Sequence, residues 1–457
     1  MKRLLILIVV LLAGCGESED LIEFGLTDDE VLPESINEPI VKQPSIDEII
    51  KEVNASGAIT DDQAESLSKV EYLYLNGLTS ITDQQAESLS KVKMLHLNGL
   101  TSITNEQAES LINDELFNKV EGLELNGLTS ITNEQAESLS KVKFLHLDGL
   151  TSITNVQAES LGKLDKLWLN GLTSINDEQA ESLGNSDYVL ELNGLTSIND
   201  EQAKGLANLT FNLQLNGLTS LTDEQVEILS NYRAGRVLGL DGLTSITDKQ
   251  AESLRKVNGI ALNGLISITD KQAASLSKDR RLDGVELDGL TSLTDAQAES
   301  LSKIESLSLS GLTSITDEQA ESLTKIESLS LNGLTSITDE QAESLSNNQY
   351  VQLTGLTSIT DEQAESLSKV VDWLELNGLT SISDEQAESL SKVEELYLNG
   401  LTSITDEQAE SLSKVKGYLE LNGLTTITDE QAESLSKVQY LTLSVACQEL
   451  VNKYKKP

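Results

Sequence analysis

The sequence is built from one segment that recurs almost unchanged, written LNGLTSITDEQAESL at residues 331–345. Most copies lie 22 or 23 residues apart, a period too short for a pair of helices that fits one strand followed by one short helix. Stacked copies share one continuous core, so 457 residues do not require several domains. The copies are indexed by the glycine after Asn, Asp, Ser or Thr, at Gly77, Gly99, Gly127, Gly149, Gly171, Gly194, Gly217, Gly242, Gly264, Gly289, Gly311, Gly333, Gly355, Gly378, Gly400 and Gly423.

The first half of each copy predicts a strand and a turn. Leu329 and Leu331 flank Ser330, so strand alternation places both leucines on one face and the serine on the other. Asn332 and Gly333 then turn the chain, because both residue types tolerate positive φ. An Asn-Gly pair often closes a β-hairpin, but here the next strand lies a full period away.

The second half of each copy predicts a short helix. Thr338 is the expected N-cap, and Gln341 three residues later completes a capping box. Ala342 and Leu345 form a narrow inward stripe of a helix of roughly two turns, which stacking must stabilise. Strands separated by helices pair in parallel through right-handed crossovers.

The motif Leu-x-Leu-Asn-Gly-Leu-Thr-Ser-Ile-Thr-Asp resembles the leucine-rich repeat, and within it the cysteine-containing subfamily. The resemblance covers residues 58–444 and implies an α/β solenoid with a parallel sheet on the concave face and short helices on the convex face. Two features depart from that subfamily. Leucines such as Leu334 occupy the position of its buried cysteine, and a period of 22 residues is shorter than its norm.

The N-terminus reads as an export signal. Lys2 and Arg3 precede a short apolar run, and nine apolar residues are too few to span a bilayer. The ending Leu-Ala-Gly-Cys resembles the bacterial lipoprotein signal, which implies cleavage before Cys15 and lipidation of its thiol. Glycine at residue 16 favours the outer membrane over the inner one by the same resemblance. An ordinary cleaved signal with an incidental cysteine is the alternative.

Five segments follow from these patterns. Residues 1–14 form the lipoprotein signal peptide, residues 15–43 a flexible acidic tether, residues 44–57 an N-terminal capping helix, residues 58–444 an array of about 16 repeats, and residues 445–457 a C-terminal capping helix.

The two caps show their own helical signals. Ser45 and Glu48 have the spacing of a capping box, ahead of an apolar face. At the other end Ala446, Leu450 and Val451 are expected to cover the last repeat, with Cys447 buried among them. If Cys15 carries lipid, Cys447 has no partner for a disulfide within the chain.

The copies differ mainly in the residue between the strand leucines and the residue before the first leucine. These two rows must face the concave side, and they hold nine of the 15 aromatic residues. Exposed Tyr and Trp often anchor protein interfaces, although drift and β-propensity also place aromatics on strands. Two clusters flank a middle from Gly239 to Ser330, where the residues between the leucines are small apart from Glu286, and drift alone does not predict this clustering. The candidate partner-binding residues are Tyr72, Tyr74, His96, Glu124, Phe144, His146, Trp168, Tyr350, Trp373, Tyr397, Tyr418 and Tyr440.

Charge and composition exclude several kinds of chemistry. A net charge of −43 repels nucleic acid and anionic lipid headgroups. No phosphate-binding loop, Gly-x-Ser-x-Gly or Cys-x-x-Cys motif occurs, and two histidines leave little material for acid-base catalysis. His96, Glu124 and His146 could form a zinc site or a pH-responsive patch, but no fourth ligand is evident, so solvated histidines are the better interpretation.

The sequence therefore predicts a lipid-anchored, exported binding protein without enzymatic activity or cofactor. Its concave surface is expected to take a protein or glycan partner, in adhesion or another envelope interaction. A structural spacer of the cell envelope is the alternative, and a metal- or pH-responsive sensor is a more distant one.

Overall fold

The computed structural model describes residues 44–112, 120–186, 188–231, 237–278, 284–324 and 326–455. The predicted signal peptide, Cys15 and the tether to residue 43 lie outside these residues. From Ser45 onward the chain forms one compact unit. None of the helices that the structure describes is both long and apolar enough to span a bilayer.

Helices and strands alternate along the array. The helices are α1 Ile46–Ser56, α2 Asp61–Leu67, α3 Asp83–Leu89, α4 Asn105–Leu111, α5 Asn133–Leu139, α6 Asn155–Leu161, α7 Asp177–Leu183, α8 Asp200–Leu206, α9 Asp223–Ser230, α10 Asp248–Leu254, α11 Asp270–Leu276, α12 Asp295–Leu301, α13 Asp317–Leu323, α14 Asp339–Leu345, α15 Asp361–Leu367, α16 Asp384–Leu390, α17 Asp406–Leu412, α18 Asp429–Leu435 and α19 Val445–Asn452. The strands are β1 Tyr72–Tyr74, β2 Met94–His96, β3 Gly122–Glu124, β4 Phe144–His146, β5 Lys166–Trp168, β6 Val189–Glu191, β7 Asn212–Gln214, β8 Val237–Gly239, β9 Gly259–Ala261, β10 Gly284–Glu286, β11 Ser306–Ser308, β12 Ser328–Ser330, β13 Tyr350–Gln352, β14 Trp373–Glu375, β15 Glu395–Tyr397, β16 Tyr418–Leu421 and β17 Tyr440–Leu443.

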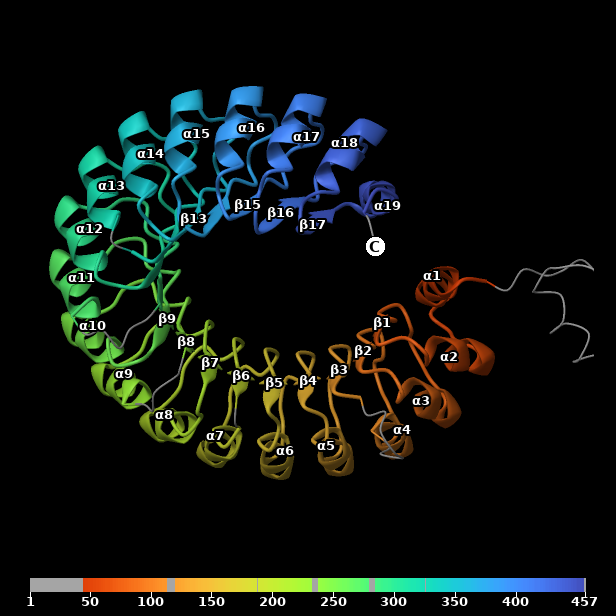
Figure 1. The fold of residues 1–457 in the computed structure, drawn as a ribbon. Helices are drawn as coiled ribbons and strands as arrows, with labels where there is room; N and C mark the ends of the chain where they lie inside the picture. The colour runs from red at the N-terminus through yellow and green to blue at the C-terminus, as the bar shows by residue number, and fades with distance from the viewer. Residues whose placement is uncertain are drawn as a thin grey trace, which may run out of the picture. The chain divides into compact units, whose positions relative to one another are not determined.

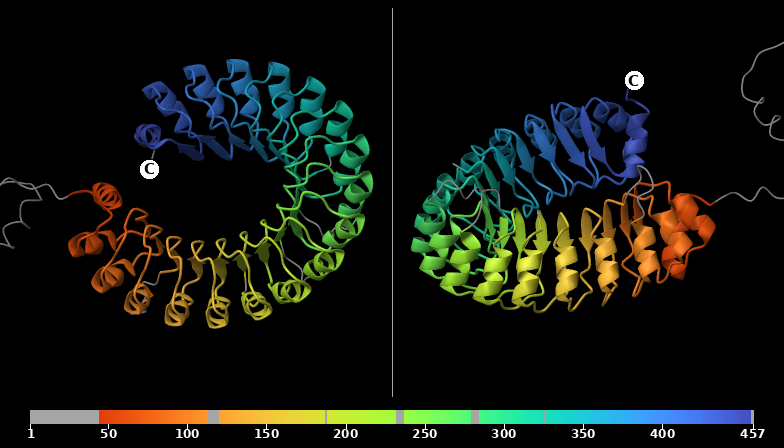
Figure 2. Two further views of the ribbon diagram at one scale, coloured as in Figure 1. Left: turned by 180° about the vertical axis from the view of Figure 1, so that it is seen from behind. Right: turned by 90° about the horizontal axis from the view of Figure 1, so that it is seen from below.

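The strands form a single parallel sheet of 17 strands in which each strand pairs with its neighbours in the sequence. The array follows an arc with the strands along its inner side and the helices along its outer side (Figures 1 and 2). This arrangement confirms the predicted α/β leucine-rich-repeat solenoid, with parallel pairing throughout and no hairpin at Asn332 and Gly333.

The core lies between the sheet and the helices. Leu329, Leu331 and Leu334 are almost fully buried, as are Ala342 and Leu345 of helix α14, and the equivalent residues of the other copies repeat this pattern. The predicted strand face and helix stripe are therefore confirmed. Leu334 fills the interior with an apolar side chain.

The repeat glycines are required for a reason other than the predicted one. Among the described glycines, positive φ occurs at Gly57, which ends helix α1, and not at Gly333. A Cβ on Gly333 would lie 2.2 Å from the carbonyl oxygen of Ser310 in the preceding copy. The prediction of positive φ was wrong, because the turn itself is unstrained and glycine is needed where two neighbouring turns approach closely.

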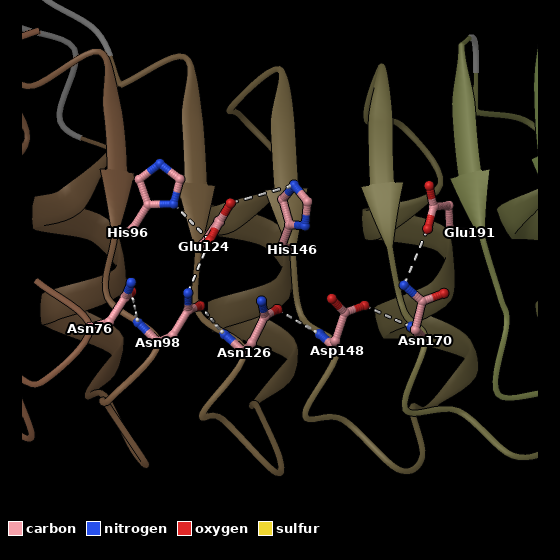
Figure 3. Close-up of polar contacts among 9 residues, drawn as sticks. All are labelled: Asn76, His96, Asn98, Glu124, Asn126, His146, Asp148, Asn170 and Glu191. Atoms are coloured by element: carbon pink, nitrogen blue, oxygen red, sulfur yellow. Dashed lines mark hydrogen bonds and ion pairs between the residues drawn. The ribbon is translucent and has the colours of Figure 1, made fainter. Parts of the chain in front are cut away.

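In most copies the asparagine or aspartate before the glycine links its copy to the next one. The backbone N–H of Asn126 donates to Asn98 Oδ1 at 3.0 Å, and the N–H of Asp148 donates to Asn126 Oδ1 at 3.0 Å. Figure 3 shows five members of this ladder, from Asn76 to Asn170. The side chain satisfies a turn amide that strand pairing leaves free, which explains why Asn or Asp recurs at this position.

The glutamine of each capping box has a second role that the sequence did not indicate. As predicted, Thr338 caps helix α14 and exchanges hydrogen bonds with Gln341. The Gln341 amide also donates to the carbonyl of Ile315 at 2.9 Å and to Asp317 Oδ1 at 2.9 Å, both in the preceding copy. The constant helix start is therefore also an inter-repeat contact.

Both ends of the sheet are covered by cap helices. Helix α1 begins after the predicted capping box of Ser45 and Glu48. Its Asn54 donates to the carbonyl of Tyr74 at 2.9 Å and accepts from the N–H of Gly77 at 2.7 Å, one residue further along the turn than the amide that the repeat asparagines bind.

At the other end, helix α19 packs on the last repeat through Cys447 and Val451, which are buried, and through the partly buried Leu450. The expected burial of Cys447 is confirmed. Ala446 is exposed, contrary to prediction, because the helix turns Cys447 toward the core instead.

Candidate functional site

The two variable rows face the concave side of the sheet. In each strand the middle residue is buried, and its two neighbours point to the other face, as in β1, where Leu73 is buried between Tyr72 and Tyr74. We call the first strand residue of each copy the first row and the third residue the second row.

None of the twelve candidate residues is buried in the interior. The first row contains Tyr72, Phe144, Tyr350, Trp373, Tyr418 and Tyr440, and the second row contains Tyr74, His96, Glu124, His146, Trp168 and Tyr397. Their predicted placement on the exposed sheet face is confirmed, and their role in binding stays a prediction.

Strands β1 to β5 carry the N-terminal patch, which we define as the seven candidate residues from Tyr72 to Trp168. The rings of Tyr74 and His96 stack with centroids 4.1 Å apart, and those of His146 and Trp168 stack at 3.8 Å. Glu124 lies between the two histidines (Figure 3). Its Oε2 is 2.7 Å from His96 Nδ1, and its Oε1 is 4.0 Å from His146 Nε2.

Burial and hydrogen bonding set the protonation behaviour of this group. Burial of Glu124 opposes its ionisation, but hydrogen bonds from Asn98 and His96 and the nearby imidazoles outweigh burial and lower the pKa of this carboxyl. Burial also lowers the pKa of His146, and the carboxylates around it oppose this effect only in part. His146 is therefore held toward its neutral form, packed against the Trp168 ring.

The two histidines and Glu124 converge, and the preferred interpretation of the histidines as solvated was wrong, because their side chains are only 12% and 24% exposed and both rings stack on aromatic neighbours. Across the described ranges, no group of three or more His, Cys, Asp or Glu side chains is arranged to hold a metal ion. One carboxylate bridging two imidazoles instead fixes the ring orientations of a flat, partly exposed surface.

Strands β13 to β17 carry the C-terminal patch, which we define as Tyr350, Trp373, Tyr397, Tyr418 and Tyr440. The ring centroids of Trp373 and Tyr397 are 5.2 Å apart, and those of Tyr397 and Tyr418 are 5.4 Å apart. Tyr350 meets the Trp373 ring edge to face at 6.2 Å. Burial, together with the charges of Glu395 and Glu420 and the neighbouring Tyr418, raises the pKa of Tyr397 to about 12.

A polar hollow of about 480 Å³ separates the two patches, and we call it the serine hollow. Gly259 and Gly284 leave room on the first row, and Ser306, Ser308 and Ser330 line its wall. The hydroxyl of Ser308 donates to Asp288 Oδ1 at 2.6 Å, and Asn332 Nδ2 donates to Ser330 Oγ at 2.8 Å. The small residues noted in the sequence thus form a depression between two aromatic surfaces.

One exposed aromatic pair escaped the sequence analysis. Tyr188 and Phe211 directly precede strands β6 and β7, and their rings stack at 5.0 Å while staying 48% and 44% exposed. They lie one residue outside the two rows considered. The signal that could have revealed them is two successive aromatics at that position, which elsewhere holds charged residues such as Glu71 and Lys93.

No protein-family profile matches this sequence, and no curated protein sequence matches it. Solved structures include similar chains at low identity. The TLR13 chain in the crystal structure of the TLR13–ssRNA13 complex is 17% identical with a TM-score of 0.49, and the match covers 83% of this chain and 64% of that one. The present chain thus spans less than two thirds of the TLR13 chain.

An internalin, InlF from Listeria monocytogenes, is also 17% identical, with a TM-score of 0.34 and coverage of 74% of this chain and 88% of that one. The leucine-rich-repeat architecture assigned above rests on the strands, helices and inter-repeat contacts of this chain itself.

Proposed function

We propose that this chain is a binding protein without enzymatic activity, and that its concave face takes a protein or glycan partner. The supporting observation is the pair of aromatic patches on the two rows that vary between copies. Exposed Tyr and Trp on a rigid surface are the side chains that most often anchor interfaces. Core residues and the repeat glycines stay nearly constant along the same copies, so the variation is concentrated where a partner would bind.

The size of the face suits a large ligand. Adjacent strands of a sheet lie about 4.8 Å apart, so the rows of this sheet extend over roughly 80 Å. A single small molecule would occupy only a fraction of that length. The serine hollow between the patches offers hydroxyl, amide and carboxylate groups, which fits the polar part of a protein or glycan surface.

The proposal includes a location. The Leu-Ala-Gly-Cys ending of the N-terminal segment supports lipidation of Cys15, and with it attachment to the bacterial cell envelope, most simply at the outer membrane. Replacing Cys15 with serine should release the protein from the membrane fraction and abolish metabolic labelling with a fatty acid. Retention of both properties would overturn this part of the proposal.

Binding is tested by removing the aromatic anchors from the two patches. Purified protein should capture a component of the native envelope, and the variant Tyr74→Ser, Trp168→Ser, Trp373→Ser should lose that component. A matched variant, Val156→Ser with Ile266→Ser, removes exposed apolar side chains outside the concave rows and should retain it.

The spacer alternative predicts a different result in the same experiment. A protein whose array length alone matters would function equally well with or without these three aromatic rings. Equal capture by wild type and the triple variant, or no capture by either, would favour the spacer.

A further inference from the structure

The C-terminal patch has carboxylates set between its aromatic rings. In the strand register, Trp373 pairs with Glu395 and Glu375 with Tyr397, and on the next strand Glu395 pairs with Tyr418. Aromatic and acidic side chains therefore alternate across β14, β15 and β16 in both rows. The first row reads Trp373, Glu395 and Tyr418, and the second row reads Glu375, Tyr397 and Glu420.

These carboxylates receive hydrogen bonds only from neutral groups among the described residues. Glu375 Oε1 accepts from Asn377 Nδ2 at 2.5 Å, and Glu420 accepts from Asn422 in the same way. The remaining contact is long, because the Tyr397 hydroxyl lies 3.5 Å from Glu395 Oε2. Within the part of the chain that the structure describes, no Lys, Arg or His forms an ion pair with any of the three.

The N-terminal end of the concave face is different, since basic groups lie beside its carboxylates. Lys93 and Lys143 pair with Glu71 and Glu121 at 2.8 and 3.2 Å, at the positions directly before strands β1 to β4. Lys166 lies 4.6 Å from the centroid of the Phe144 ring. One end of the concave face thus neutralises its carboxylates internally, and the other end leaves them to solvent.

The unpaired charges act on each other and on the rings. Burial and the charge of Glu420 raise the pKa of Glu375. Burial comes first among the causes that raise the pKa of Tyr397, and the charges of Glu395 and Glu420 add to it. A positive group placed between them would relieve this repulsion and could also lie over the electron-rich face of a Tyr or Trp ring.

We propose that the C-terminal patch, strands β13 to β17, binds an extended, arginine-rich segment of a partner protein. This inference deepens the proposed function and rests on it. Arginine fits the pattern better than other cations, because its planar group stacks on aromatic rings and makes paired hydrogen bonds to a carboxylate. The net charge of −43 would steer such a segment toward the protein.

The geometry limits the length of that segment. Five strands at about 4.8 Å spacing extend over roughly 19 Å, which an extended peptide covers with about six residues. Side chains on one face of an extended peptide recur roughly every 7 Å. This interval is close enough to the strand spacing for long arginine side chains to reach the carboxylates of successive strands.

The test uses a synthetic arginine-containing peptide of about six residues and a twin in which every arginine is citrulline, which keeps the shape but loses the charge. Binding to the full protein is measured by titration calorimetry. The arginine peptide should bind, and the citrulline peptide should bind at least about tenfold more weakly.

A pair of protein variants locates the site. A triple variant should bind the arginine peptide about tenfold more weakly or worse, since three charge pairs are lost. It carries Glu375→Gln, Glu395→Gln and Glu420→Gln. The control carries the same charge change on the exposed convex helices α14, α15 and α16, as Glu340→Gln, Glu362→Gln and Glu385→Gln, and should bind as wild type does. Equal binding of the two peptides, or equal weakening in both variants, would overturn the inference.

Envelope capture measured with the same variants separates this inference from the proposed function. If the variant lacking Glu375, Glu395 and Glu420 captures the envelope component as wild type does, while the variant lacking the aromatic anchors does not, the concave face binds a partner but not through cations. If the arginine peptide fails and no envelope component is captured, both ideas fail.

Discussion

Replacing Gly355 with alanine should destabilise the array, although the change adds only one methyl group. The Cβ would lie 2.3 Å from the carbonyl oxygen of Asn332 and 2.6 Å from that of Leu334, both in the preceding copy. The first distance is about 0.7 Å short of the 3.0 Å that Cβ atoms keep from other heavy atoms. Because both obstacles are backbone atoms, no side-chain rotation can relieve the overlap, and the two copies must move apart.

The cost follows from what that movement disturbs. Overpacking of a tight interior contact costs about 1–3 kcal/mol. The N–H of Thr354 donates to Asn332 Oδ1 at 3.1 Å across the same junction, and loss of that bond costs about 1 kcal/mol more. We expect Gly355→Ala to lower the free energy of unfolding by about 2–4 kcal/mol.

Gly284→Ala is the matched control. A Cβ on Gly284 meets no atom closer than 3.9 Å, so alanine there should be neutral or stabilise the fold by about 0.4–1 kcal/mol through the unfolded chain. The two variants are compared by urea unfolding, with circular dichroism as the signal. If the long array unfolds in steps, hydrogen exchange near β13 measures the local free energy of unfolding. Equal unfolding midpoints for Gly355→Ala and Gly284→Ala would refute this account of the repeat glycines.

Three further predictions concern single side chains. Asn54→Ala should lower local stability by about 1–3 kcal/mol and speed hydrogen exchange in β1, because it leaves the Gly77 amide without its hydrogen-bond acceptor. Lys51→Ala, on the exposed side of the same helix, should have neither effect. His146 should titrate below 6.5 by NMR. Since the unfolded chain then takes up this proton more readily, acidification through pH 6.5 should lower stability, and His146→Phe should remove that component. In an ultraviolet titration, Tyr397→Phe should remove the ionisation step of one tyrosine near pH 12. If the step that disappears lies near pH 10 instead, the burial of the Tyr397 hydroxyl would be contradicted.

The sequence predicted the elements of each copy because local chemistry determines them. A threonine, serine or asparagine with glutamine three residues later specifies where a helix begins, and alternating apolar residues specify which strand face is buried. Both signals recur in every copy, so the parallel register and the exposed rows follow. For the same reason the placement of Tyr74, Trp168 and Trp373 on the concave face was predictable.

Contacts between copies were harder to predict, since they depend on how closely two turns approach. Glycine after asparagine suggested positive φ, whereas the structure uses glycine for space beside a carbonyl. The stacking of His96 on Tyr74 and the depth of the serine hollow depend on rotamers and sheet curvature, which residue spacing does not encode. The exposed pair Tyr188 and Phe211 was missed because it lies just before the strands.

The asparagine ladder has a consequence for how such a chain can change length. Most copies take a side-chain acceptor for a turn amide from the copy before them, and Asn54 of helix α1 provides an acceptor for the Gly77 amide of the first turn. A tandem duplication of one whole unit would therefore create a junction identical to those already present. We expect growth or shrinkage by complete units to be tolerated, and extra residues between a helix and the next strand as well, because the ladder bond is kept across steps of 28 residues from Asn98 to Asn126 and 25 residues from Asn216 to Asp241.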